Sequence, residues 1–211
     1  MKTAALRLTV TAALLASGCA GLDTEAPSAP ESTFAENARE LRAITQWEMR
    51  GRIAIDTGSE ARQGRFTWWQ DGESLRLNIR GPLNAGAVEI RGDADSLTVR
   101  SRRETRTLSD PELQLSELLG WWLPVTSLPN WLLGLPDPRF PDASVVDGGR
   151  MRDLQQRAWA VRYSEYERHG SVEIPAGMTF SHSSLELVVT VDDWSAGAGS
   201  NLELDGGARA Q

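Results

Sequence analysis

The chain has 211 residues, with 22 basic and 29 acidic side chains and a formal net charge of −7. This length fits one domain of ordinary size with its own core. The negative charge, with no basic run longer than Arg102 and Arg103, argues against a nucleic-acid partner. Lys2 is the only lysine and the sequence has no P-loop, which argues against nucleotide hydrolysis and Schiff-base chemistry. The single cysteine, Cys19, excludes an internal disulfide.

Residues 1–18 have the pattern of a secretory signal peptide. Lys2 and Arg7 precede an apolar run over residues 8–16, which is about half the length that spans a bilayer. Small residues then lead directly into Cys19, and this ending resembles the lipobox of bacterial lipoproteins. The resemblance implies that Cys19 becomes the first residue of the mature chain and carries acyl groups on its sulfur and nitrogen. The alternative is an ordinary secretory signal followed by an unrelated cysteine.

Residues 19–32 are expected to be a lipidated N-terminus followed by a flexible linker. The linker is small, polar and proline-bearing, and it reaches about 40 Å when fully extended. Ala20 follows the cysteine, where aspartate is the inner-membrane retention signal of enterobacterial lipoproteins, so the resemblance implies sorting to the outer membrane. An acidic domain does not hold a membrane by overall polybasic attraction, so we expect the acyl chains to anchor it.

The folded domain is expected over residues 33–194. Thr33 and Glu36 have the spacing of a capping box, and a helical apolar period continues to about residue 46. From Trp47 the period changes to two, which predicts a strand of about ten residues. The same alternation returns at Phe66 and Trp68; at Leu75, Leu77 and Ile79; at Val88 and Ile90; at Leu97 and Val99; at Trp159, Val161 and Tyr163; and at Leu185, Leu187, Val189 and Val191.

The expected strands are joined by short turns, such as Asp71 followed by Gly72 and His169 followed by Gly170. These links are too short for crossover helices, so neighbouring strands should be antiparallel. We count about eight to eleven strands. A single sheet of this width with one apolar face should curl toward a barrel, which predicts a mainly β fold of the α+β class.

Residues 108–135 do not follow the strand pattern. One helix is expected over about residues 110–119 and a second over about residues 128–133, each followed by a glycine. The segment 121–125 between them is too apolar to be left in water and too short to cross a membrane. We therefore expect the two helices to cover the mouth of the curled sheet. Residues 195–211 are rich in Gly, Ala and Ser and are expected to form a disordered tail.

The chain offers little for catalysis or metal binding. His169 and His182 are the only histidines and lie in no metal-binding motif, so each is expected to be a solvated surface residue. Carboxylate pairs at residues 165 and 167 and at residues 192 and 193 leave a glycan hydrolase open. Charged strand ends and turns explain these pairs more simply. We expect neither enzymatic activity, nor a metal site, nor a cofactor other than the lipid on Cys19.

A series of short strings follows one order along the chain: WEMRGRIAI at 47–55, FTWWQ at 66–70, GPL at 81–83, GWWLPV at 120–125, WLLGLP at 131–136, WAVRY at 159–163, then Met178 and Trp194. Together, behind a lipobox, these strings resemble the LolB family of outer-membrane lipoprotein receptors. The similarity covers residues 46–194. It implies an incomplete antiparallel β-barrel enclosing an apolar cavity, with helices as a lid.

The resemblance also implies a function and its partners. A protein of this kind accepts lipoproteins from a soluble periplasmic carrier similar to LolA, binds their acyl chains and inserts them into the outer membrane without ATP. We expect a lipid-anchored monomer that faces the periplasm. The alternative is a structural or accessory envelope lipoprotein whose sheet packs on another protein. Burying about 45 methylenes of a lipoprotein is worth on the order of 35 kcal/mol, so a carrier needs an apolar hollow.

Two groups of site residues follow from the resemblance. The membrane-transfer loop is matched by Pro82 and Leu83, with Leu83 as the residue that is exposed to the membrane, and Asn84 stands where the family commonly has glycine. Side chains that alternate into the curled sheet or belong to its cover are candidates for the acyl cavity, with a filled core as the alternative. These candidates are Trp47, Met49, Ile53, Phe66, Trp68, Leu77, Ile79, Leu118, Trp131, Trp159, Val161 and Leu187.

Overall fold

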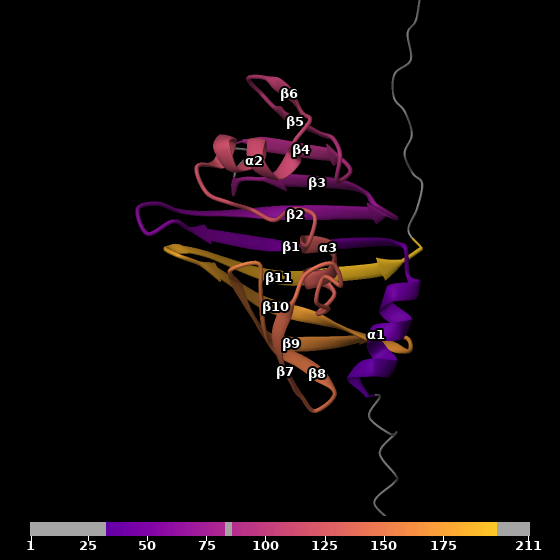
Figure 1. Ribbon diagram of the computed structural model, residues 1–211. Coiled ribbons are helices and arrows are strands. Elements are labelled where there is room, and N and C mark those ends of the chain that lie inside the picture. Colours follow the sequence, from indigo (N-terminus) through magenta and orange to yellow (C-terminus); the bar gives the residue numbers. More distant parts are fainter. Residues whose placement is uncertain (1–32, 83–85, 198–211) are drawn as a thin grey trace, which may run out of the picture. The chain divides into compact units, whose positions relative to one another are not determined.

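The computed structural model describes residues 33–82 and 86–197, which form one antiparallel sheet of eleven strands with three helices (Figure 1). The strands are β1 (Gln46–Asp56), β2 (Ala61–Asp71), β3 (Ser74–Arg80), β4 (Ala87–Gly92), β5 (Leu97–Ser101), β6 (Thr105–Leu108), β7 (Asp142–Asp147), β8 (Arg150–Gln156), β9 (Trp159–His169), β10 (Val172–His182) and β11 (Leu185–Ala196). The helices are α1 (Phe34–Ala43), α2 (Pro111–Leu119) and α3 (Leu128–Leu132).

Two antiparallel meanders make up the sheet, and they meet at its centre. The strand order is β6-β5-β4-β3-β2-β1-β11-β10-β9-β8-β7, so β1 pairs with β2 on one side and with the last strand, β11, on the other. Strands β6 and β7 form the two edges and are not paired with each other. The expected fold, a mainly β chain whose antiparallel sheet is left open, is confirmed.

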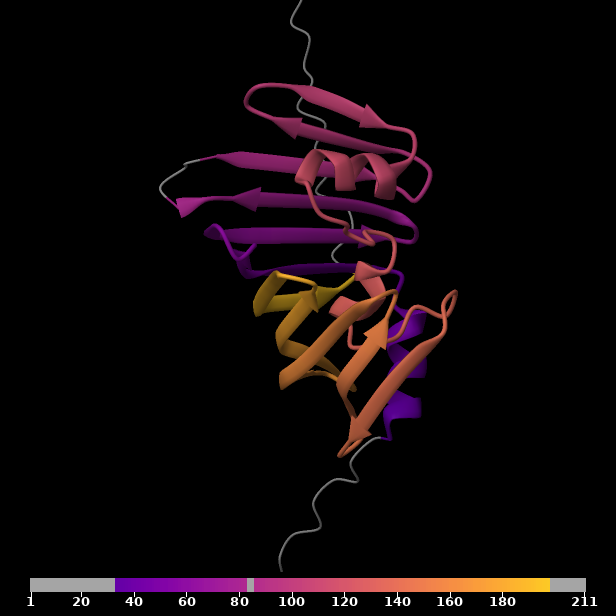
Figure 2. The same ribbon diagram turned by 60° about the vertical axis from the view of Figure 1, so that its left-hand side comes forward.

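The sheet bends near Gly51 on β1. The register between β1 and β11 shifts between Arg50 and Gly51, which marks a bulge. A Cβ atom built on Gly51 would lie 2.1 Å from the carbonyl oxygen of Thr190 and 2.8 Å from the ring of Phe66. Only glycine therefore fits between these neighbours. Figure 2 shows the strands from β11 to β7 running at an angle to those from β6 to β1.

The first helix forms as expected and lies along one edge of β10. The side chain of Thr33 accepts a hydrogen bond from the backbone N–H of Glu36, and the Glu36 carboxylate accepts one from the N–H of Thr33, which completes the capping box. The Asn37 amide donates to the carbonyl oxygen of Glu173 at 2.9 Å and accepts from its N–H at 2.8 Å. α1 thus substitutes for a strand partner in the first half of β10.

The helices of the 108–135 segment also form as expected. Asp110 caps α2 by accepting a hydrogen bond from the N–H of Leu113, Pro111 occupies its first turn, and Gly120 ends it in the left-handed conformation. Figure 1 shows α2 in front of β3 and β4, and α3 in front of β1 and β11. Both helices contribute to a single buried apolar cluster with the face of the sheet that they cover.

The C-terminal end of the domain lies slightly beyond the expected boundary at residue 194. Strand β11 continues to Ala196, with Ser195 opposite Glu48 and Ala196 opposite Trp47. The expected signal peptide, linker and lipidated Cys19, as well as tail residues 198–211, lie outside the described residues. The described residues all belong to one compact unit. Within the described ranges, no helix is long and apolar enough to cross a membrane.

Candidate functional site

Most side chains expected to line an acyl cavity lie together between the covered face of the sheet and its helices. They are at most 9% exposed and belong to the buried apolar cluster: Trp47, Met49, Phe66, Trp68, Leu77, Trp131, Trp159, Val161 and Leu187. Ile53 and Ile79 are partly buried and pack against this cluster. Leu118 differs, because it is 37% exposed and borders a hollow of about 440 Å³ between α2 and β6. The clustered side chains pack against one another and against the helices.

Aromatic rings supply much of this apolar surface. Trp47 and Trp68 lie on neighbouring strands and stack with their ring centroids 6.3 Å apart. Trp131 of α3 lies 6.5 Å from Trp159 and 6.4 Å from Phe180, so it joins the helical cover to strands β9 and β10. Large flat rings provide broad apolar surface at low conformational cost.

The two histidines are more buried than the sequence suggested. The ring of His182 stacks on Trp159, with centroids 5.2 Å apart, and lies 5.8 Å from Trp122. The ring of His169 meets Trp194 edge-on at 5.3 Å. Each is half-buried at the end of a strand, where a large aromatic side chain covers it. The expectation of solvated surface histidines is therefore wrong, because no local pattern marks these cross-strand contacts.

The segment that connects α2 and α3 completes the cover. Leu123 and Val125 are buried in the apolar cluster, and Trp121 and Trp122 are half-buried against it. α2 itself contacts the core through a narrow stripe. Leu115 is fully buried, whereas the other leucines of the helix, Leu113, Leu118 and Leu119, are all exposed. A narrow apolar contact leaves the position of α2 dependent on polar contacts.

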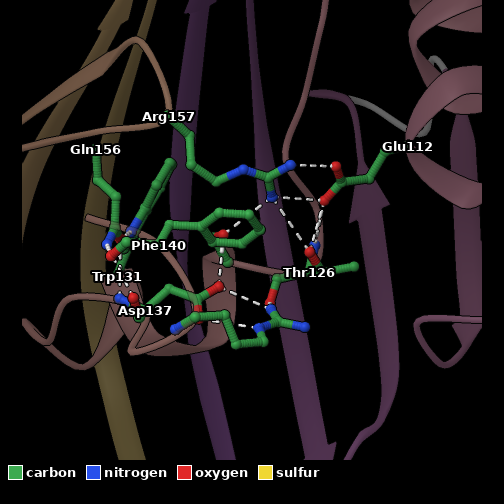
Figure 3. A network of polar contacts seen from close by, with 9 residues as sticks. Glu112, Thr126, Trp131, Asp137, Phe140, Gln156 and Arg157 are labelled. Atoms are coloured by element: carbon green, nitrogen blue, oxygen red, sulfur yellow. Dashed lines mark hydrogen bonds and ion pairs between the residues drawn. The ribbon is translucent and has the colours of Figure 1, made fainter. Parts of the chain in front are cut away.

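Those polar contacts centre on Arg157, in the turn between β8 and β9 (Figure 3). Its guanidinium donates to both carboxylate oxygens of Glu112, in the first turn of α2, at 2.8 and 2.5 Å. The Thr126 hydroxyl donates to the same carboxylate at 2.6 Å. The guanidinium also lies 5.1 Å from the ring centroid of Trp122 and 4.1 Å from that of Phe140. Arg157 therefore fixes α2 and the following segment at once.

Gln156 and Asp137 extend the network beneath α3. The Gln156 carbonyl oxygen accepts from Trp131 Nε1 and from the N–H of Asp137, each at 2.8 Å. Its amide nitrogen donates to the carbonyl oxygens of Asp137 and Phe140, at 2.9 and 2.8 Å. The Asp137 carboxylate accepts from the Ser127 hydroxyl at 2.7 Å and from Arg139. The side chain of Gln156 is thus fully hydrogen-bonded.

Both carboxyls of this network are held in their charged form. Burial alone would raise the pKa of Glu112, but hydrogen bonds from Arg157 and Thr126 and the charge of Arg157 outweigh it, so this pKa lies below its ordinary value. For Asp137, burial is again the largest influence and is outweighed by hydrogen bonds from Arg139 and Ser127, which lower the pKa. The network is therefore ionised at neutral pH.

Two further hollows bear on the site. One, of about 250 Å³, lies where the segment after α2 meets the turns of the sheet, with Leu75, Val125, Pro129 and Arg139 among its walls. The other, of about 580 Å³, includes Pro82 of the expected transfer loop. Leu83, like Cys19, lies outside the described residues, so the structure places only Pro82 of that loop.

Sequence reasoning found the apolar face but missed the polar network. Arg157 and Gln156 sit at a hairpin without a glycine or asparagine signal, and a lone Arg or Gln at a turn looks like surface. Glu112 was visible in the sequence as an acidic residue in the first turn of the expected helix, where acidic residues are common. Its partner, Arg157, lies 45 residues further along the chain, so the sequence did not reveal the ion pair. The carboxylate pairs show ordinary surface roles. Asp192, for instance, pairs with Arg52 at 3.0 Å.

The domain belongs to the class of open antiparallel sheets whose apolar face is covered by short helices. A solved structure of a LolA superfamily protein from Nitrosomonas europaea matches it with a TM-score of 0.50 and 11% identity, covering 78% of this chain and 94% of that one. A family model described as "Outer membrane lipoprotein LolB" matches residues 45–194. The chain belongs to the LolB family.

Curated relatives agree with this assignment. An outer-membrane lipoprotein LolB from Nitrosococcus oceani is 34% identical over 201 residues, which is 93% of this chain and all of that protein. One from Coxiella burnetii is 32% identical over 186 residues, or 86% and 89% of the two chains. The expected resemblance is confirmed. The LolB family is a family of lipoprotein transport receptors rather than of enzymes, works with LolA and depends on no cofactor. Among the described residues, no His, Cys, Asp or Glu cluster could hold a metal ion.

Proposed function

We propose that this chain is a lipid-anchored receptor on the periplasmic side of the outer membrane. It accepts lipoproteins from a soluble carrier similar to LolA, shelters their acyl chains against the covered face of the sheet and releases them into the membrane without ATP. Acyl groups on Cys19 hold it at the membrane, and it acts as a monomer. Membership of the LolB family and the composition of the covered face support this proposal.

The observation that carries the proposal is the contrast between the covered face and its cover. The face is a continuous apolar surface of strand residues, and its lid is two short helices with a narrow buried stripe. In the closed form the side chains of the cover fill the space above the sheet. Acyl chains therefore enter when the cover moves outward, and each buried methylene contributes about 0.8 kcal/mol.

This arrangement makes transfer possible without an energy source. While the cover is displaced, the leucines and tryptophans of the sheet lose contacts that an acyl chain restores. If the exposed face of the receptor binds acyl chains more tightly than the donor does, the chains move from donor to receptor by the difference in affinity alone. Release requires a still better apolar environment, which a bilayer provides. Leu83, the proposed transfer residue, is expected to contact the bilayer during release.

The test is transfer of a lipoprotein from its soluble carrier to membranes, with two steps measured separately. Acceptance is co-isolation of the lipoprotein with the receptor, and delivery is its recovery in vesicles. Leu83→Glu should accept normally and fail to deliver. Val146→Glu, which places the same charge on the exposed edge strand β7, should do both. Normal delivery by Leu83→Glu would remove Leu83 from the proposal. A protein that accepts no lipoprotein and instead co-purifies with an envelope protein would support the accessory alternative.

A further inference from the structure

Three arginines form a row across neighbouring strands on the face of the sheet opposite the core. Arg52 on β1 lies directly opposite Arg65 on β2, and Arg65 lies directly opposite Arg80 on β3. The alternate residues of these strands, among them Phe66 and Ile79, face the buried cluster, so the arginine side chains face outward. All three are exposed. The row spans two inter-strand distances, which is about 10 Å.

The row has an excess of positive charge that the described residues do not neutralise. Arg52 pairs with Asp192 at 3.0 Å. Within residues 33–82 and 86–197, Arg65 and Arg80 form no ion pair or hydrogen bond through their side chains. Like charges directly opposite each other on a sheet are destabilising. This unneutralised charge lies on a hollow that also has exposed apolar walls, and this combination suits an anionic partner.

The row borders the hollow of about 580 Å³, whose walls combine charged and apolar groups. Pro82, at the start of the loop after β3, is exposed there, and Val188 of β11, on the same hollow, is 39% exposed. Arginine groups beside exposed apolar side chains suit the level of a bilayer where phosphates meet acyl chains. A single free phosphate is contacted within about 3 Å, and a row of 10 Å on an open face suits several phosphates held in one surface.

We propose that Arg52, Arg65 and Arg80 bind the phosphate groups of an anionic phospholipid surface. The row orients the domain so that the end of the sheet carrying Pro82 faces the membrane. The negative net charge of the chain conceals this local positive excess. The sequence argued against electrostatic attraction between the whole domain and a membrane, and that argument does not apply to this face. The proposal goes beyond acyl transfer, because headgroup binding requires neither the apolar cluster nor the opening of the cover.

Vesicle flotation of residues 31–211, which include the compact sheet domain, tests the proposal without the expected lipid anchor. Vesicles of phosphatidylcholine are compared with vesicles that also contain phosphatidylglycerol, at low and at physiological salt. The double variant Arg65→Gln with Arg80→Gln removes two charges from the row. The matched control, Arg76→Gln with Arg91→Gln, removes two charges from directly opposed positions of β3 and β4 on the same outward face, outside the hollow. Circular dichroism confirms that both variants fold.

The wild-type domain should bind the phosphatidylglycerol vesicles and not the neutral ones, with binding weakened by salt. At about 1 kcal/mol per basic residue near an anionic surface, the row variant should bind roughly 30-fold more weakly. The control pair should keep most of the binding. Equal binding to both vesicle types, equal loss in the two variants, or no loss in the row variant would each overturn the proposal. Complete competition by millimolar inorganic phosphate would identify a free anion as the ligand instead.

Discussion

Arg157 and Glu112 lie 45 residues apart in sequence and are joined by two hydrogen bonds of 2.8 and 2.5 Å. Arg157 belongs to the β8–β9 turn in one half of the sheet, whereas Glu112 lies in the first turn of α2, which lies over β3 and β4 in the other half (Figure 1). The pair therefore connects the cover to both meanders. Because both side chains are mostly buried, solvent screens this pair only weakly.

Replacing Glu112 by Gln should loosen α2. The change leaves the Arg157 guanidinium without its anionic partner in a poorly solvated position, and it should lower the free energy of unfolding by about 1–3 kcal/mol. The closed cover should also open more often, so that an apolar fluorescent probe enters faster. Urea unfolding followed by tryptophan fluorescence measures the first effect, and stopped-flow probe uptake the second.

A matched control for this change is Glu117→Gln on the same helix, because Glu117 is exposed and forms no hydrogen bond or ion pair among the described residues. It should shift the free energy of unfolding by less than about 0.5 kcal/mol and leave probe uptake unchanged. If the two variants had the same free energy of unfolding and the same rate of probe uptake, the ion pair between Glu112 and Arg157 would not hold the cover.

The carboxyl groups of Glu112 and Asp137 should make the free energy of unfolding depend on pH. The pKa values of Glu112 and Asp137 are lowered in the folded protein, from ordinary values of 4.5 and 3.8. The unfolded chain therefore binds protons first as the pH falls. Their contribution to stability is complete above about pH 4.5 and is lost as the pH falls through the lower pKa values of the folded state.

Urea unfolding measured between pH 7 and pH 3 checks this dependence. The free energy of unfolding of the wild type should fall through the acidic part of this range, and the fall should be shallower for Glu112→Gln, which has one carboxyl fewer to protonate. Parallel curves for the two proteins would show that the acid dependence comes from other carboxyls.

Gln156 offers a different test, because it is a neutral group that makes four hydrogen bonds inside the protein. Gln156→Leu leaves the indole N–H of Trp131, the N–H of Asp137 and the carbonyl oxygen of Phe140 without this partner, whereas the carbonyl oxygen of Asp137 still accepts from the N–H of Phe140, so the free energy of unfolding should fall by about 3–5 kcal/mol. Gln155→Leu on the same strand is the control, since Gln155 is exposed and its side chain has no partner among the described residues. It should be nearly neutral. Similar losses in the two variants would contradict the assigned role of Gln156.

Strands whose two faces differ were predictable from the sequence. On β2 and β3 every second residue points to the core, and the alternation of Phe66, Trp68, Leu75 and Leu77 is visible in the one-dimensional pattern. The same holds for α1 and α2, because capping residues and a terminal glycine act within a few neighbours along the chain.

Strands whose environment depends on distant segments were not individually predictable. The first half of β10 is buried at every position, and its free edge is paired with Asn37 of α1 rather than with a strand, so its sequence shows no alternation. Strand β7 is exposed throughout and pairs only with β8, which leaves no apolar face to detect. The Arg157 network was hidden for the same reason: its members come from a turn, a helix and two loops that only the fold brings together.

Leu115 is the one leucine of α2 that is buried in the core, and it should help to hold the helix in place together with the Glu112 ion pair. Leu115 is fully buried, and Leu113 on the same helix is 57% exposed. Leu115→Ala should lower the free energy of unfolding by about 2–5 kcal/mol, whereas Leu113→Ala should change it by less than about 0.5 kcal/mol. The function of the cover adds a second expectation. Leu115→Ala removes contacts that exist only while the cover is closed, so it should favour the open form. It should therefore speed probe uptake more than Leu113→Ala does. Slower or unchanged uptake in a destabilised Leu115→Ala protein would show that α2 is part of a fixed core, and that acyl chains enter by another route.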